Sequence, residues 1–184
     1  MNNIFNESQK ALINLPARND TESELESSFS FPAGSLNFRG QDFIFPEGFK
    51  ADVLTKWLEE SLLLVEINIS AVITVECARC LKPVNLEISE KLMYLYYPHG
   101  VESESLDGFD DYMPVELEYF ARVLDVMPQI QESIYTLLPM RVLCREDCKG
   151  LCPNCGADLN EGSCSCVNED VDPRLEALRN FIIE

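Results

Sequence analysis

The chain has 184 residues, of which 46% are hydrophobic and 25% charged, so a packed core is feasible and wholesale disorder is not expected. Its 32 Asp and Glu against 14 Lys and Arg give a net charge of −18, which argues against binding nucleic acid or anionic lipid with the whole surface. No run approaches the roughly 18 apolar residues of a membrane span, and residues 1–20 lack the pattern of a secretory signal, so we expect a cytoplasmic protein.

The first part of the chain contains weak secondary-structure signals. Residues 1–30 are polar and show no sustained hydrophobic period, so we predict an edge segment that is partly mobile. Residues 36–45 place three phenylalanines around Gly40, which predicts two short strands joined by a turn. Residues 49–60 alternate as a strand does, although their spacing also fits a helix. We favour a strand there.

The clearest signal is a long alternation of apolar and polar residues. Residues 65–76 place apolar side chains on one face and polar side chains on the other, which is typical of a half-buried antiparallel strand. The alternation resumes at Val84 and runs to Tyr96. The intervening Cys77 and Cys80 should therefore lie at the tip of a β-hairpin.

The second half of the chain begins with an acidic stretch. Residues 101–118 contain seven Asp or Glu and no Lys or Arg, which predicts a solvated, extended loop. Apolar residues then recur at helical spacing over 130–138, after Pro128, and predict a short helix that packs on the core. Residues 172–182 open with an Asp and a Pro suited to a helix start, which predicts a short C-terminal helix.

Six of the eight cysteines fall within residues 144–166. Two residues separate Cys152 from Cys155, so both sulfurs can reach one tetrahedral ion, and the following Gly156 allows a tight backbone turn. Cys164 and Cys166 follow after a hairpin-like return. We assign these four cysteines to one zinc site.

The remaining cysteines are Cys77, Cys80, Cys144 and Cys148. They form two local pairs that only folding can join, and a second four-thiolate zinc site is the economical interpretation. Because Cys148 and Cys152 are four residues apart, the pairs can also be exchanged between the sites. Spacing alone leaves that alternative open.

Three other roles for the cysteines fit the sequence less well than structural zinc does. A disulfide framework belongs to small secreted chains, and this chain has enough apolar residues for a core. Neither Cys-x-x-Cys pair lies between a strand and a helix, as a redox-active dithiol prefers. A catalytic zinc usually enlists His or a carboxylate, and the single histidine, His99, is far in sequence from every cysteine pair. Both sites are therefore predicted to be closed and structural.

Five basic residues lie within or beside the cysteine pairs, although the chain as a whole is acidic. They are Arg79, Lys82, Arg141, Arg145 and Lys149. Their simplest role is to neutralise the zinc thiolates. The alternative is a local basic face that approaches phosphate.

Four segments carry a family resemblance: the hairpin pair in 77–81, the run 148–156 with Leu159 and Asn160, the pair Cys164 and Cys166, and the closing 172–178. In these segments the chain resembles the YceD family of bacterial and plastid proteins, which are implicated in accumulation of large-subunit ribosomal RNA. Some members lack the second cysteine group but keep the first, so the resemblance implies two separate sites. It implies no reaction, and the chain shows no catalytic set.

We therefore expect an α+β protein with a mainly antiparallel sheet, a zinc-capped hairpin, one internal helix, a C-terminal zinc knuckle and a terminal helix. Its segments would be the polar 1–30, a β-rich core over 31–143 that includes the acidic loop, and a zinc-binding module over 144–184.

The expected function is non-enzymatic support of large-subunit (23S-type) rRNA accumulation or processing, through binding. The partner would be that rRNA or its precursor, or a basic ribosomal or processing protein. A zinc- or redox-responsive regulator is the main alternative, and a metal-dependent nuclease is a weaker one.

Overall fold

The computed structural model describes most of the chain between residues 3 and 166. The described residues are 3–5, 9–15, 17, 24–59, 61–100, 108–118 and 122–166. The predicted C-terminal helix lies outside them. Within these ranges, no helix is long and apolar enough to cross a membrane.

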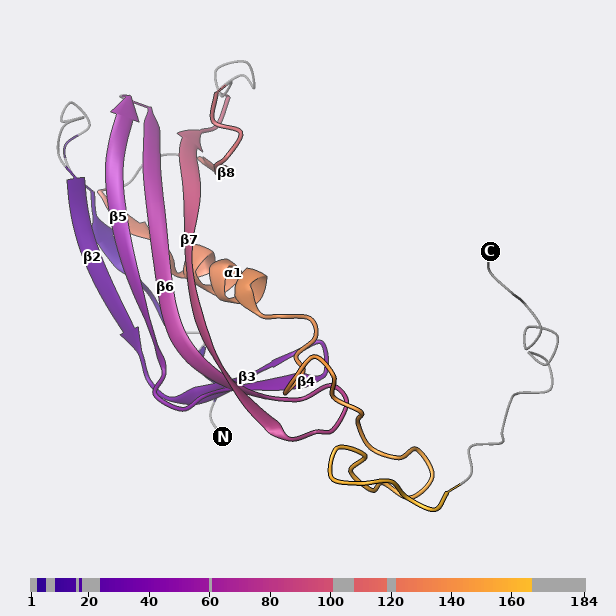
Figure 1. Cartoon of the computed structure of the whole chain (residues 1–184). Helices are drawn as coiled ribbons and strands as arrows, with labels where there is room; N and C mark the ends of the chain where they lie inside the picture. Colours follow the sequence, from indigo (N-terminus) through magenta and orange to yellow (C-terminus); the bar gives the residue numbers. More distant parts are fainter. Residues whose placement is uncertain are drawn as a thin grey trace, which may run out of the picture.

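A curved β-sheet dominates the described residues (Figure 1). Its strands are β2 (Glu24–Phe31), β3 (Gly34–Phe38), β4 (Gln41–Phe45), β5 (Phe49–Glu59), β6 (Leu62–Glu76), β7 (Pro83–Pro98) and β8 (Met113–Leu117). The order is β2-β5-β6-β4-β3, with β7 paired to β6 and β8 paired to β7. All pairs are antiparallel except β7 with β8. The mainly antiparallel sheet predicted from the sequence is confirmed.

The long strand β6 is the centre of the sheet. It pairs with β7 from Leu63 opposite Tyr96 to Glu76 opposite Pro83, so the hairpin predicted from the alternation is confirmed. On its other side β6 pairs with β5, and nearer its end Thr74 pairs with Ile44 of β4. The cysteine-bearing tip is therefore held at one end of a rigid, multiply paired strand.

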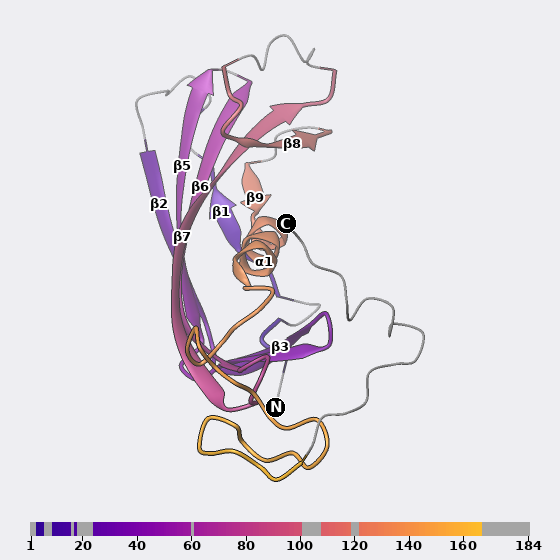
Figure 2. The same cartoon turned by 45° about the vertical axis from the view of Figure 1, so that its right-hand side comes forward.

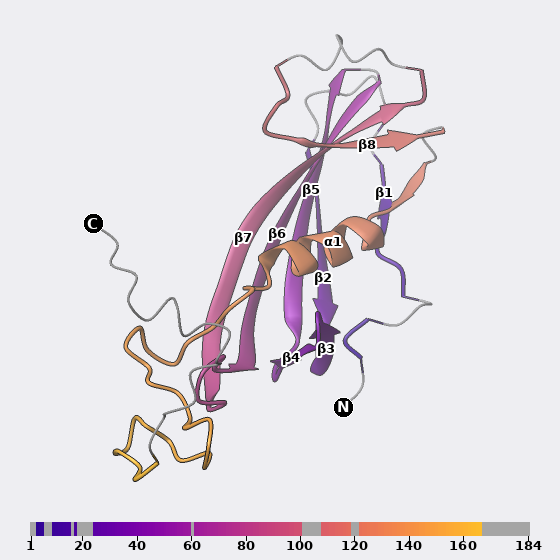
Figure 3. The same cartoon turned by 90° about the vertical axis from the view of Figure 1, so that its right-hand side faces the viewer.

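Helix α1 (Met127–Leu137) crosses the concave face of the sheet (Figure 3). Its Ile130 and Ile134 are fully buried in the main core, as the helical spacing predicted. Beside it, β1 (Leu12–Asn14) and β9 (Val123–Asp125) form a separate two-stranded sheet (Figure 2). The Asp125 carboxylate accepts the backbone N–H groups of Ala11, at 3.1 Å, and Met127, at 3.0 Å, which fixes this sheet at the helix start.

One sequence-based expectation needs revision, and another is confirmed in part. Residues 113–117, placed within the acidic loop, form β8, because Met113, Val115 and Leu117 pack partly buried against the core. In the polar N-terminal segment, β2 (Glu24–Phe31) lies at the edge of the sheet, as the predicted edge segment requires, while Phe5 and Ile13 lie in the core. The strands predicted over 36–45 and 49–60 are confirmed as β3, β4 and β5.

Candidate metal centres

The tip of the β6–β7 hairpin positions the first two cysteines. Cys77 follows the last residue of β6, and its N–H donates to the carbonyl of Lys82 at 2.8 Å, while Leu81 N–H donates to the Cys77 carbonyl at 2.9 Å. Leu81 adopts a φ of 59°, a left-handed conformation that closes this tight turn. Ala78 N–H donates to the carbonyl of Val142 at 2.8 Å, which brings the segment before Cys144 to the hairpin tip.

The first cysteine group consists of Cys77, Cys80, Cys144 and Cys148, whose sulfur atoms all lie within 4.8 Å of one another. Cys77 Sγ lies 3.8 Å from Cys148 Sγ, and Cys80 Sγ lies 3.5 Å from Cys144 Sγ. Sulfurs around a tetrahedral zinc ion, with Zn–S bonds of about 2.3 Å, are about 3.8 Å apart. A disulfide would require about 2.05 Å. The four thiols therefore fit a metal ion of zinc size.

The second cysteine group consists of Cys152, Cys155, Cys164 and Cys166, again with all sulfurs within 4.8 Å. Gly156 N–H donates to the Cys152 carbonyl at 2.8 Å, and the Gly156 φ of 73° makes the turn beneath the Cys152–Cys155 pair. Folding therefore assembles the same two sets of four that the spacing favoured, and the exchanged pairing does not occur. Both groups could hold a metal ion.

The two groups differ in burial. In the first group Cys77, Cys80 and Cys148 are buried and only Cys144 is exposed. Leu143, Leu151 and Val84 pack around these buried sulfurs and exclude water from them. In the second group only Cys152 is buried, while Cys155 and Cys166 are exposed and Cys164 is partly exposed. A metal ion in the second group would be the more accessible to chelators and oxidants.

The sequence of this chain matches the model of one protein family. The model of the family described as "Large ribosomal RNA subunit accumulation protein YceD" matches residues 65–182, more than half of the chain. The chain belongs to the YceD family. The matched region begins within β6 and contains all eight cysteines, so both cysteine groups lie inside the family's domain.

Curated relatives come from bacteria and plants. An uncharacterised protein of Mycobacterium tuberculosis is 32% identical over 117 residues, which cover 63% of this chain and 54% of that protein. The uncharacterised YlbN of Bacillus subtilis is 29% identical over 136 residues, 72% of this chain and 71% of that protein. The chloroplastic YCED homolog 1 of Arabidopsis thaliana, named for large ribosomal RNA subunit accumulation, is 31% identical over 58 residues, 32% of this chain and 18% of that protein.

The chain spans about half the length of the mycobacterial relatives it matches. No solved structure matches it significantly.

The polar surroundings of this YceD-family chain lower the pKa of at least one thiol in each cysteine group. Burial raises the pKa of Cys77, but the N–H groups of Arg79 and Cys80 outweigh it and lower the pKa to about 6. The N–H groups of Cys155 and Asn154 likewise lower the pKa of Cys152 to about 6. Each group therefore has a thiolate at neutral pH before any metal binds.

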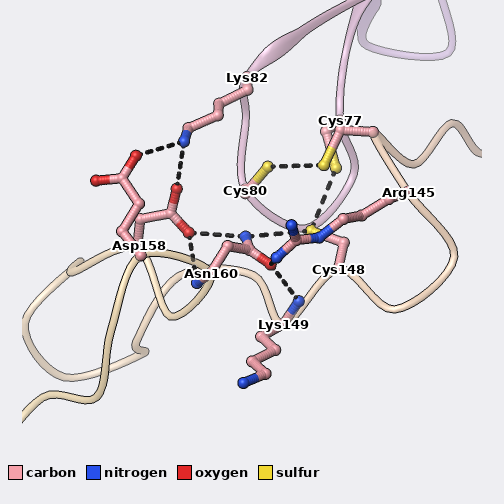
Figure 4. A network of polar contacts seen from close by, with 10 residues as sticks. Cys77, Cys80, Lys82, Arg145, Cys148, Lys149, Asp158 and Asn160 are labelled. Carbon is pink, nitrogen blue, oxygen red and sulfur yellow. Dashed lines mark hydrogen bonds and ion pairs between the residues drawn. The ribbon is translucent and has the colours of Figure 1, made fainter.

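Three of the five basic residues noted in the sequence make contacts within the chain. Arg79 Nη1 donates to the Cys148 carbonyl at 2.6 Å, and Lys82 pairs with two carboxylates of the second group's loop. Arg145 contacts a carboxylate at 3.2 Å and an amide oxygen at 2.8 Å. Among the described residues, neither Arg141 nor the ammonium group of Lys149 has such a contact, and Figure 4 shows the Lys149 side chain directed away from the network. These three cations contact carboxylate, carbonyl and amide oxygens rather than sulfurs, so they hold together the segments around the cysteine groups.

Sequence reasoning missed the centre of this network, Asn160 (Figure 4). Its Oδ1 accepts the N–H of Lys149 and the guanidinium of Arg145, each at 2.8 Å. Its Nδ2 donates to Cys148 Sγ at 3.5 Å and to the Asp158 carboxylate at 2.7 Å. Two signals were available, its position between the two cysteine pairs of the second group and its place in the family resemblance. Neither predicted its contacts with Arg145, Cys148 and Lys149, which only folding creates.

Proposed function

We propose that this chain is a non-enzymatic ribosome biogenesis factor that supports accumulation of large-subunit rRNA through binding, and that it acts in the cytoplasm. The family match over residues 65–182 carries the proposal, since the family and its chloroplastic relatives are named for large ribosomal RNA subunit accumulation. The charge and the distribution of the cysteines supply the physical details.

Both cysteine groups are proposed to hold a structural zinc ion. Zinc with four thiolate ligands has no open coordination position, so it would cross-link the chain rather than activate a substrate. In the first group the ion would join the hairpin tip to residues 144–148. In the second group it would close the loop between Cys155 and Cys164.

The proposed partner is a basic ribosomal or processing protein, with direct contact to large-subunit rRNA or its precursor confined to the metal-ordered end. A net charge of −18 attracts a basic protein and repels phosphate at long range. Most basic side chains near the cysteine groups are already paired within the chain, which leaves few for phosphate.

Complementation tests the function. Cells depleted of the protein should show a lowered ratio of large-subunit to small-subunit rRNA, and the wild-type chain should restore it. Cys77→Ser/Cys80→Ser should fail to restore it at equal protein abundance, since the hairpin tip loses its metal cross-link. An unchanged rRNA ratio in depleted cells would refute the function.

Affinity purification at increasing ionic strength identifies the partner. A basic protein that remains bound after nuclease treatment and is lost at high salt supports the proposed protein partner. Recovery of RNA alone, sensitive to nuclease, would support direct rRNA binding instead.

A zinc- or redox-responsive regulator is the second candidate function, favoured by the exposure of Cys155 and Cys166. Mild oxidant should then change rRNA accumulation in cells that carry the wild-type chain. It should have no such effect with Cys155→Ser/Cys166→Ser if the second group is the sensor.

A further inference from the structure

The loop between the two cysteine pairs of the second group, residues 158–161, lies against the first group. Asn160 Nδ2 is 3.5 Å from Cys148 Sγ, and Asn160 Oδ1 accepts the N–H of Lys149, the residue after that cysteine. Lys82, on the hairpin that carries Cys77 and Cys80, pairs with Asp158 at 2.8 Å and Glu161 at 2.7 Å (Figure 4). Side chains from one group's loop therefore contact a sulfur and a lysine of the other.

The backbone joins the two groups as closely as the side chains do. Leu151 N–H donates to the Arg79 carbonyl at 3.2 Å, and Leu159 N–H donates to the Gly150 carbonyl at 2.9 Å. Gly150 has a φ of 78°, and a Cβ there would lie 3.0 Å from the Arg79 carbonyl oxygen. The hairpin tip, the chain between the groups and the loop thus lie in successive contact, and a side chain at Gly150 would crowd the Arg79 carbonyl.

A metal ion in the second group would restrain this loop, because Cys155 and Cys164 hold its two ends. An amide donor to a metal-bound thiolate stabilises the charged sulfur and keeps it oriented, as outer partners of metal ligands commonly do. We infer that Asn160 is a positioning residue that couples the two groups: metal in the second group holds Asn160 against Cys148, and so slows metal loss from the first group.

This inference rests on the proposal that both groups hold zinc. To the extent that metal in the second group raises the affinity of the first group, thermodynamic reciprocity requires metal in the first group to raise the affinity of the second group by the same factor. The two sites would then load and empty together, although the second is exposed and the first is buried.

Site-resolved zinc release tests the coupling in the full-length, zinc-loaded protein. A chelator is added, cysteines that become free are alkylated in timed pulses, and peptide mass spectrometry reads each cysteine group separately. Asn160→Ala should release zinc from the first group about 10- to 100-fold faster, the usual effect of losing such a partner. Asn37→Ala, which removes an exposed amide bonded to Asp42 in the β3–β4 hairpin, should release at the wild-type rate.

Asn160→Asp separates a donor role from a purely structural role. The carboxylate keeps an acceptor for Lys149 N–H and Arg145 but replaces the donor to Cys148 with an oxygen that repels the thiolate. Coupling through the donor predicts release at least as fast as in Asn160→Ala. Because Asp158 also faces this amide and pairs with Lys82, Asn160→Asp/Asp158→Asn is compared with Asp158→Asn alone, and the double variant should release zinc from the first group faster.

A double-mutant comparison completes the test. Cys155→Ser/Cys166→Ser, which removes the second site, should also accelerate release from the first group, and adding Asn160→Ala should give no further acceleration. Wild-type release rates in Asn160→Ala, or additive effects, would overturn the coupling while leaving the zinc and rRNA proposals intact. Fewer than two zinc ions per wild-type chain would overturn the coupling together with the zinc assignment, but not the rRNA function.

Discussion

Lys82 Nζ lies 2.8 Å from the Asp158 carboxylate, and this ion pair joins the β6–β7 hairpin to the loop of the second cysteine group. The Lys82 ammonium, together with the N–H of Asn160, lowers the pKa of Asp158 to about 2, below its unfolded value of about 3.9. The same ion pair raises the pKa of Lys82. The contact is partly sheltered, since Asp158 is only 13% exposed.

The first prediction concerns the pH dependence of this contact. Because the folded-state pKa of Asp158 is lowered, its stabilising effect should be complete above about pH 4 and be lost as the pH falls toward 2. Hydrogen exchange at the Leu151 amide, which donates to Arg79, should be faster in Asp158→Asn than in the wild type above pH 4. The difference should vanish near pH 2, with both proteins metal-free and reduced. A difference in exchange rate that does not depend on pH would contradict the role given to the ionised Asp158 carboxylate.

The second prediction concerns thiol ionisation. In the metal-free, reduced protein the first thiolates should form near pH 6, because N–H donors lower the pKa of Cys77 and Cys152. Thiolate ultraviolet absorbance against pH measures this. Cys77→Ser/Cys152→Ser should lose the step, whereas Cys144→Ser/Cys166→Ser should keep it, since neighbouring thiols raise the pKa of Cys144 and Cys166 to about 12. A first step near the ordinary value of about 8.5 would refute the prediction.

The third prediction concerns the turn between β4 and β5. Gly48 has a φ of 77°, and a Cβ there would lie 1.9 Å from the Phe31 carbonyl oxygen at the end of β2. Gly48→Ala should therefore lower the free energy of unfolding by about 1–3 kcal/mol more than Gly40→Ala does. Gly40 is the matched control, because its φ of 81° imposes the same backbone strain but open space surrounds its Cα. Equal denaturant midpoints for the two variants would contradict the prediction, because they would show that the backbone around Gly48 shifts enough to accept a Cβ.

The fourth prediction concerns the packing of α1 on the sheet. Ile130 is fully buried between the helix and the strands, so Ile130→Ala should lower the free energy of unfolding by about 2–5 kcal/mol in denaturant titrations. Met140 follows the helix and is 84% exposed, and Met140→Ala should change stability by less than about 0.5 kcal/mol. Comparable losses in both variants would mean that α1 is not the main support of this face.

The sequence by itself determined the elements whose pattern is regular. The alternation of apolar and polar residues predicted β6 and β7, because one face of each strand is buried and the other is exposed to solvent. Pro128 and Pro139 marked the two ends of α1, because Pro fits the first turn of a helix but cannot continue it. Sequence reasoning missed β8, since the seven acidic residues of 101–118 obscured the short apolar alternation of Met113–Leu117, a strand that is only half-buried. Cysteine spacing likewise favoured the two sets of four, because ligands two residues apart can share one ion.

Only the tertiary structure decided between the two ways of pairing the cysteines. Cys77 and Cys148 are separated by 71 positions, and their sulfurs meet because the paired strands β6 and β7 carry the hairpin tip to residues 142–148. The contact of Asn160 with Cys148 likewise arises only when the loop folds back on the first cysteine group. Ligand spacing is a local property of the chain, whereas the distance between two sites depends on how the sheet and the loops fold, and no periodicity encodes it.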